Sequence, residues 1–104
     1  MLFHVERRRI SLVAGAYSDV TPYFTGGLVQ QLLVKPNTAG NTFDFSLTNS
    51  FGDVIYQRLT NTGTINEVDL NVPVTGVVTF AIANATVATN PVTILLVVKD
   101  GANV

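Results

Sequence analysis

The chain has 104 residues, with six Lys and Arg against seven Asp and Glu, a single His, and no Cys or Trp. This length fits one domain built around one hydrophobic core. The absence of Cys excludes disulfides, a thiolate nucleophile and Cys-type zinc sites in this chain. A net charge of −1 gives no reason to expect general affinity for nucleic acid or for acidic membranes.

The composition favours β structure. Val, Ile, Thr, Phe and Tyr together make up 43 residues, and such side chains suit a pleated surface but lose χ1 freedom in a helix. Only 12% of residues are charged, about half of the roughly 25% that is usual for a soluble globular chain. Solubility therefore depends on neutral polar residues, above all 13 Thr and nine Asn.

The first element in the chain has an inconsistent alternation of apolar residues. Phe3 and Val5 are apolar at odd positions. Ile10 and Leu12 are apolar at even positions. One flat strand cannot bury both sets on one face, because successive side chains point to opposite sides.

Two explanations of this shift remain open. One is a β-bulge in a first strand. The other is an N-terminal arm over residues 1–9 that lies on a neighbouring subunit, with a single β-sandwich domain over residues 10–104. In that case Arg7, Arg8 and Arg9 would pair with carboxylates or phosphates of the neighbour.

From residue 10 onward, short apolar runs between turn signals predict seven or eight strands. In chain order they cover residues 10–14, 17–21, 28–35, 43–48, 54–59, 67–72, 77–83 and 92–99. Gly52 and Gly63 lie in expected turns, and Pro73 is expected to end the sixth strand because it has no N–H for the ladder. No segment has the apolar spacing of a helix. The fold class expected is therefore all-β, an antiparallel β-sandwich of jelly-roll type, with an immunoglobulin-like topology as the alternative.

Three of these segments, 28–34, 77–83 and 92–98, are apolar on both faces. A two-layered sandwich buries one face of each strand, so neighbouring strands of this kind would expose a hydrophobic patch. Either another part of the same chain covers it, or a partner does, in a homo-oligomer (dimer or trimer) or a larger assembly. The residues predicted to contact a partner are Phe3, Val5, Arg7, Arg8, Arg9, Val29, Leu33, Leu95 and Val97.

Side chains suited to catalysis or metal binding are few. His4 is the only imidazole, and no Ser lies in a Gly-x-Ser-x-Gly turn. The acidic residues Asp44, Glu67 and Asp69 alternate outward on expected strands, and Asp53 lies in a turn, where carboxylates are most often solubilising groups. We therefore expect no enzymatic activity, no cofactor and no metal site. No stretch approaches the about 20 apolar residues that cross a bilayer as a helix, so no membrane partner is expected.

Two segments carry a resemblance to a known class of protein. The run NTFDFSLTNSFGDVIY (41–56), followed by GVVTFAIANA (76–85), resembles small β-sandwich virion proteins of tailed bacteriophages and is similar to capsid decoration or cement subunits. The resemblance implies a non-enzymatic subunit on the capsid surface of a virion. It would bind the major capsid protein and stiffen the shell, without nucleic acid as a partner.

Two other functions remain open. A tail, fibre or connector subunit would depend on the same assembly contacts. A carbohydrate-binding β-sandwich module would need a platform of exposed aromatic rings. The candidates for such a platform are Tyr17, Tyr23, Phe24, Phe51 and Tyr56.

Overall fold

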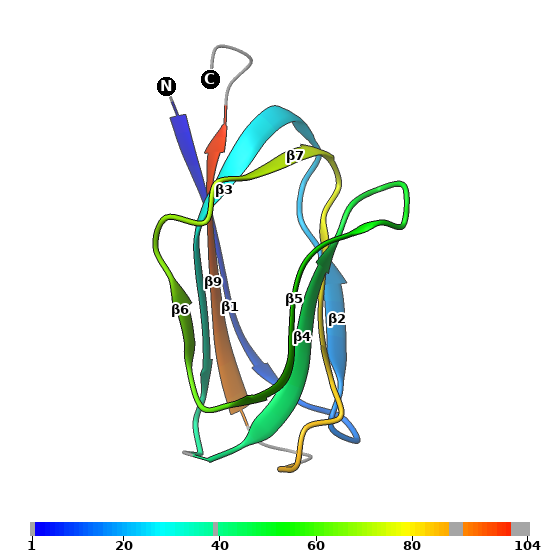
Figure 1. Ribbon diagram of the computed structural model, residues 1–104, viewed down its shortest axis with the longest axis vertical. Coiled ribbons are helices and arrows are strands. Elements are labelled where there is room, and N and C mark those ends of the chain that lie inside the picture. The colour runs from blue at the N-terminus through cyan, green and yellow to red at the C-terminus, as the bar shows by residue number, and fades with distance from the viewer. Residues whose placement is uncertain (1, 39, 88–90, 101–104) are drawn as a thin grey trace.

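The structure is a computed structural model that describes residues 2–38, 40–87 and 91–100. Two antiparallel β-sheets pack face to face (Figure 1). The described residues form nine strands: β1 (Leu2–Ser11), β2 (Tyr17–Val20), β3 (Phe24–Pro36), β4 (Thr42–Thr48), β5 (Val54–Thr62), β6 (Ile65–Glu67), β7 (Val72–Gly76), β8 (Thr79–Ala83) and β9 (Pro91–Asp100). They include no helix, and so none with the length and apolar character needed to span a membrane.

The strand order is that of a jelly roll. One sheet has the order β1-β9-β3-β6, with β7 also paired to β3, and the other has the order β2-β8-β4-β5. The pairs β4·β5, β3·β6, β2·β8 and β1·β9 are nested along the chain, each enclosing the one before it, as in one long antiparallel hairpin that turns between β4 and β5. Rolling that hairpin places β3 beside β9 and β4 beside β8. This arrangement confirms the jelly-roll prediction over the immunoglobulin-like alternative, in which seven strands divide differently between the sheets.

The core lies between the two sheets and is formed by the side chains on one face of each long strand. Phe43, Phe45 and Leu47 of β4 are buried, and the residues between them are only half-buried. Phe80 and Ile82 of β8 complete the same layer. The predicted turn at Gly52, between the strands expected over 43–48 and 54–59, is confirmed: β4 and β5 pair as a hairpin, and Gly52 has the positive φ of +86° that glycine adopts readily.

The predicted strand 67–72 is wrong. β6 ends at Glu67, the chain then bends, and β7 begins only at Val72. Asn71, just before β7, has a left-handed φ of +52°, which breaks the alternation. Pro73 does not end a strand but lies inside β7, an edge strand whose outer side needs no N–H donor.

The N-terminal residues belong to the sandwich. β1 pairs with β9 without a register shift, from Leu2 opposite Asp100 to Ser11 opposite Pro91. Neither the expected arm nor the expected bulge is therefore found in residues 2–11. The apolar residues change from odd to even positions because His4, Glu6 and Arg8 occupy inward positions of β1 ahead of Ile10.

A bulge lies instead in β3. Val29 is opposite Val98 of β9, but Gln31 is opposite Val97, so Gln30 is an extra residue in β3. The bulge turns Val29 toward the core, where its exposed fraction is 0%. The prediction that Val29 and Leu33 share an outward face is therefore wrong for Val29.

Candidate functional site

The sheet β1-β9-β3-β6 presents an outward surface on which most of the predicted contact residues gather. We call this surface the outer face and define it by Phe3, Val5, Arg7, Arg9, Leu28, Gln31, Leu33, Lys35, Thr93, Leu95, Val97 and Lys99. Phe3 is 60% and Val5 54% exposed. Leu33, Leu95 and Val97 are half-buried.

The register of the strands sets the outer face in rows. Val5 of β1 lies opposite Val97 of β9, and Leu95 of β9 lies opposite Leu33 of β3. Side chains opposite one another in an antiparallel pair are about 5 Å apart at Cβ, so these four form one apolar strip across three strands. The strip is part of the two-faced hydrophobicity that the sequence predicted, without Val29.

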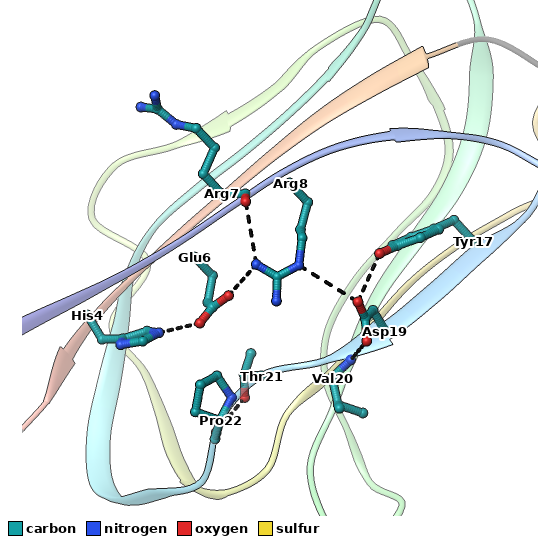
Figure 2. A network of polar contacts seen from close by, with 9 residues as sticks. All are labelled: His4, Glu6, Arg7, Arg8, Tyr17, Asp19, Val20, Thr21 and Pro22. Carbon is teal, nitrogen blue, oxygen red and sulfur yellow. Dashed lines mark hydrogen bonds and ion pairs between the residues drawn. The ribbon is translucent and has the colours of Figure 1, made fainter.

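The three successive arginines do not share a face. Arg7 lies opposite Leu95 and Arg9 opposite Thr93, both on the outer face. Arg8 points to the other side of β1, toward β2, while Arg7 is directed away from that side (Figure 2). Arg8 forms an ion pair with Glu6, and its Nε lies 3.7 Å from a carboxylate oxygen of Asp19. Arg8 is thus engaged within the chain, on the side of β1 opposite to the outer face.

A polar network closes the open edge of the sandwich between β1 and β2 (Figure 2). His4 and Arg8 both bind the buried carboxylate of Glu6. The ring of His4 also lies edge-on to Phe24, with the ring centroids 5.4 Å apart. These contacts explain how polar side chains occupy the inward positions of β1 without leaving a buried charge unpaired.

Asp19 forms the β2 side of this network. Its carboxylate accepts hydrogen bonds from the backbone N–H of Val20 at 2.8 Å and from the hydroxyl of Tyr17 at 3.0 Å. The Val20 N–H, followed by the Tyr17 hydroxyl and Arg8, lowers the pKa of Asp19. Burial, together with the neighbouring Asp19, raises the pKa of Tyr17. The hydrogen bond to Glu6 raises the pKa of Arg8.

The opposite open edge, between β5 and β6, is closed in the same way. Arg58 Nη1 donates to Glu67 at 2.8 Å and Arg58 Nη2 donates to Asn61 at 3.1 Å. The hydroxyl of Tyr56 donates to the same carboxylate at 3.4 Å, and burial raises the pKa of Tyr56. An arginine and a carboxylate thus join the two sheets at each edge, which accounts for two of the six Lys and Arg residues.

Asp44 has a structural role that the sequence did not indicate. It accepts hydrogen bonds from the Thr60 N–H and from Asn84 Nδ2, each at 2.8 Å. Both donors belong to residues with left-handed φ, +51° for Thr60 and +56° for Asn84. These two donors, the Thr60 N–H first, lower the pKa of Asp44. Its carboxylate therefore stabilises two strained backbone positions, which accounts for an acid that could otherwise be assigned to catalysis.

Two features of the outer face were missed in the sequence. Lys35 and Lys99 extend the row pattern, with Lys35 opposite Thr93 on β9 and Lys99 opposite Phe3 on β1. A pocket of about 310 Å³ opens beside the first of these pairs and is lined by Arg9, Lys35, Pro36, Asn37 and Thr93. In the sequence, Lys35 and Lys99 already lie at positions that alternation directs outward. That these cations lie on one face with Arg7 and Arg9 follows only from the pairing of β1, β9 and β3.

The aromatic residues considered for carbohydrate binding do not form one platform. Phe24 belongs to the core, with an exposed fraction of 2%. Tyr17 packs near Phe80, and Tyr56 packs edge-on to Phe45. Only Tyr23 and Phe51 of the five candidates are highly exposed. No group of three His, Asp or Glu side chains suited to a metal ion occurs among the described residues.

Comparison with known proteins relates the chain to others by fold. No protein-family model and no curated protein sequence matches the chain. Among solved structures, it is similar to a chain in the capsid asymmetric unit of cyanophage Pam1, with 11% sequence identity, a TM-score of 0.59, and coverage of 95% of this chain and 85% of that chain. At this identity the similarity shows a shared fold, and the coverage shows that the two chains are of comparable length.

Two further similarities are weaker and concern larger chains. The VP2 subviral particle of infectious bursal disease virus matches with 10% identity and a TM-score of 0.39, over 98% of this chain and 34% of that one. A family two carbohydrate esterase from Cellvibrio japonicus matches with 8% identity and a TM-score of 0.38, over 96% and 35%. The chain thus spans about a third of the length of each, and neither supports a functional argument. The match with a TM-score of 0.59 shows a shared fold, and the strand order identifies that fold as a jelly roll.

Proposed function

We propose that this protein is a non-enzymatic structural subunit of a virion, of the capsid decoration or cement type, which binds the major capsid protein at the capsid surface. The observation that carries the proposal is the fold shared over nearly the whole of both chains with a small chain of a phage capsid asymmetric unit. The jelly roll is a recurrent fold of viral capsid domains. A small jelly roll of this length can add to a shell as a separate subunit.

The outer face supports the same proposal. It exposes Phe3 and Val5 beside the apolar strip, and surfaces of this kind mark protein–protein contacts. Four titratable side chains, Glu6, Arg8, Arg58 and Glu67, form ion pairs at the edges of the sandwich, and Asp44 on the outward side of β4 binds Thr60 and Asn84, so these groups have structural partners. A dimer or trimer on the shell, and the tail or connector alternative, would use the same surface.

Sedimentation with capsid particles tests this function. Particles of the virus that encodes the chain, prepared without it, are mixed with the purified protein and pelleted through sucrose. We expect saturable co-sedimentation at a fixed number of copies per particle, and particles that withstand more heat before releasing their genome. Particles that pellet without the protein at any concentration would contradict the proposal.

Two variants link that result to the outer face. Leu95→Glu and Val97→Glu place a carboxylate in the apolar strip and should abolish co-sedimentation while the variants still fold. Ser46→Glu, on the outward side of β4 in the other sheet, is the matched control and should bind as the original protein does. Binding that is unchanged by both strip substitutions would move the contact to another surface.

A further inference from the structure

The cations of this protein are distributed very unevenly. Four of the six Lys and Arg residues lie on the outer face: Arg7, Arg9, Lys35 and Lys99. None of these four forms an ion pair with any residue that the structure describes. The chain as a whole has a net charge of −1, so the positive charge of this face is a local property and not a consequence of composition.

Carboxylates are turned away from the same face. Glu6 of β1 lies opposite the buried Leu96, and Glu67 of β6 lies opposite the buried Leu32, so both are on the inner side of the sheet. Among side chains with a described position, none that is acidic points outward from these strands. The outer face therefore combines an apolar strip with four cations that have no ion-pair partner in the part of the chain that the structure describes.

The pocket at one end of the face is suited to an anion. Arg9, Thr93 and Lys35 are aligned in one row across β1, β9 and β3. The two cations are two strand spacings apart, about 10 Å between backbones, a span within which both long side chains can reach one group. Thr93 places a hydroxyl between them, and the pocket of about 310 Å³ is large enough for a carboxylate side chain. A guanidinium favours such a group because its planar donors match the two carboxylate oxygens.

We propose that the outer face recognises an acidic protein surface, in which apolar side chains cover the strip and carboxylates meet the four cations, one of them in the Arg9–Lys35 pocket. The inference rests on the proposed function, because it gives the chemistry of the capsid surface on which the subunit would sit. Complementary charge fixes the orientation and register of such a contact, while burial of the strip supplies its affinity.

Nucleic acid is the other polyanion that could meet these cations, and the apolar strip argues against it. Phosphate backbones are bound by cations and hydrogen-bond donors, and bases stack on aromatic rings. The centre of the outer face is aliphatic, with Val5, Leu33, Leu95 and Val97, and Phe3 is its only aromatic side chain. A protein surface can contact the strip through apolar side chains and the four surrounding cations through carboxylates.

Titration of the ¹⁵N-labelled protein, followed by NMR, tests the proposal without particles. The probes are a 12-residue peptide of alternating Glu and Leu, the corresponding Lys and Leu peptide, and a DNA duplex. We expect the acidic peptide to shift amide signals of β1, β9 and β3 and the basic peptide to leave them in place. Shifts caused by DNA at lower concentration than by the acidic peptide would overturn the proposal in favour of nucleic acid. The absence of shifts on these strands with the acidic peptide would also overturn it.

Substitutions test whether the acidic peptide binds in the Arg9–Lys35 pocket. Arg9→Gln combined with Lys35→Gln should weaken binding of the acidic peptide about tenfold or more, because two charge-assisted contacts are lost. Ser18→Glu combined with Gln57→Glu changes the net charge by the same amount on exposed positions of β2 and β5, and should weaken it much less. Equal weakening by both pairs would reduce the effect to overall charge and contradict a specific pocket.

The same variants separate this inference from the proposed function. If the original protein binds particles and Arg9→Gln/Lys35→Gln binds them equally well, the acidic-surface proposal fails while the capsid role stands. If the original protein does not bind particles but its outer face binds the acidic peptide, the capsid role fails and the face has an acidic partner elsewhere.

Discussion

Val29→Ala should destabilise the domain more than Leu33→Ala, although the leucine substitution removes more side-chain atoms. Val29 is fully buried, whereas Leu33 is half-buried on the outer face. The two methyl groups lost from the core cost about 1.6 kcal/mol in transfer free energy, at about 0.8 kcal/mol per group. The space that they leave raises the cost to about 2 kcal/mol. Leu33→Ala should cost about 1 kcal/mol or less, because part of that side chain already contacts water.

Urea unfolding followed by circular dichroism measures both free energies, at several protein concentrations so that any association is recognised. A loss of about 2 kcal/mol corresponds to a lower melting temperature by roughly 8 to 16 °C in a domain of this size. Equal losses, or a larger loss for Leu33→Ala, would refute the bulge at Gln30, since Val29 would then face outward as simple alternation predicts.

Three further predictions concern the edge strand β1, the loss of stability at acid pH and a turn. Deletion of residues 1–9 should abolish a cooperative thermal transition, because β9 loses a partner over most of its length; a sharp melt of the shortened chain would show that β1 is dispensable. The pKa values of Asp19 and Asp44 are lowered by folding, so the stability that they contribute is present above about pH 4 and is lost as the pH falls through the lower, folded-state values. Asp44→Asn should therefore flatten the fall of the melting temperature below about pH 4, and an unchanged profile would argue against the bonds to Thr60 and Asn84. Gly15→Ala should be more destabilising than Gly52→Ala, since both have positive φ but only the first would bring a Cβ to 3.0 Å from a backbone oxygen; equal melting temperatures would contradict that close approach.

The elements that follow strict alternation could be predicted from the sequence. The β4–β5 hairpin has apolar residues at every second position of its first strand and a glycine in its turn, so local pattern and tertiary structure agree. The bulge in β3 could not be placed in this way. In the sequence the bulge is marked only by two successive polar residues, Gln30 and Gln31, where alternation would place a single polar residue. A bulge changes the direction of every side chain before it, and this reversed the assignment of Val29.

The N-terminal strand could not be oriented from its own sequence. Apolar residues usually point inward, so Phe3 and Val5 suggested an arm or a bulge. In the structure they point outward, because Glu6 and Arg8 find partners on β2 and inside β1 itself. Contacts between segments that are distant along the chain decided the outcome. The same holds for the pocket beside Thr93, whose two cations come from β1 and β3.

Because the chain has no Cys, the reaction of a single introduced thiol with maleimide can show whether the outer face is covered on the capsid. Val97→Cys places one thiol at the centre of the outer face, and Ser46→Cys places one at a comparably half-buried position of the other sheet. On capsid particles, maleimide labelling of Val97→Cys should slow by about an order of magnitude or more, while Ser46→Cys reacts as in the free protein. Undiminished labelling of bound Val97→Cys, or protection of Ser46→Cys in its place, would contradict the assignment of the outer face as the surface through which this subunit binds.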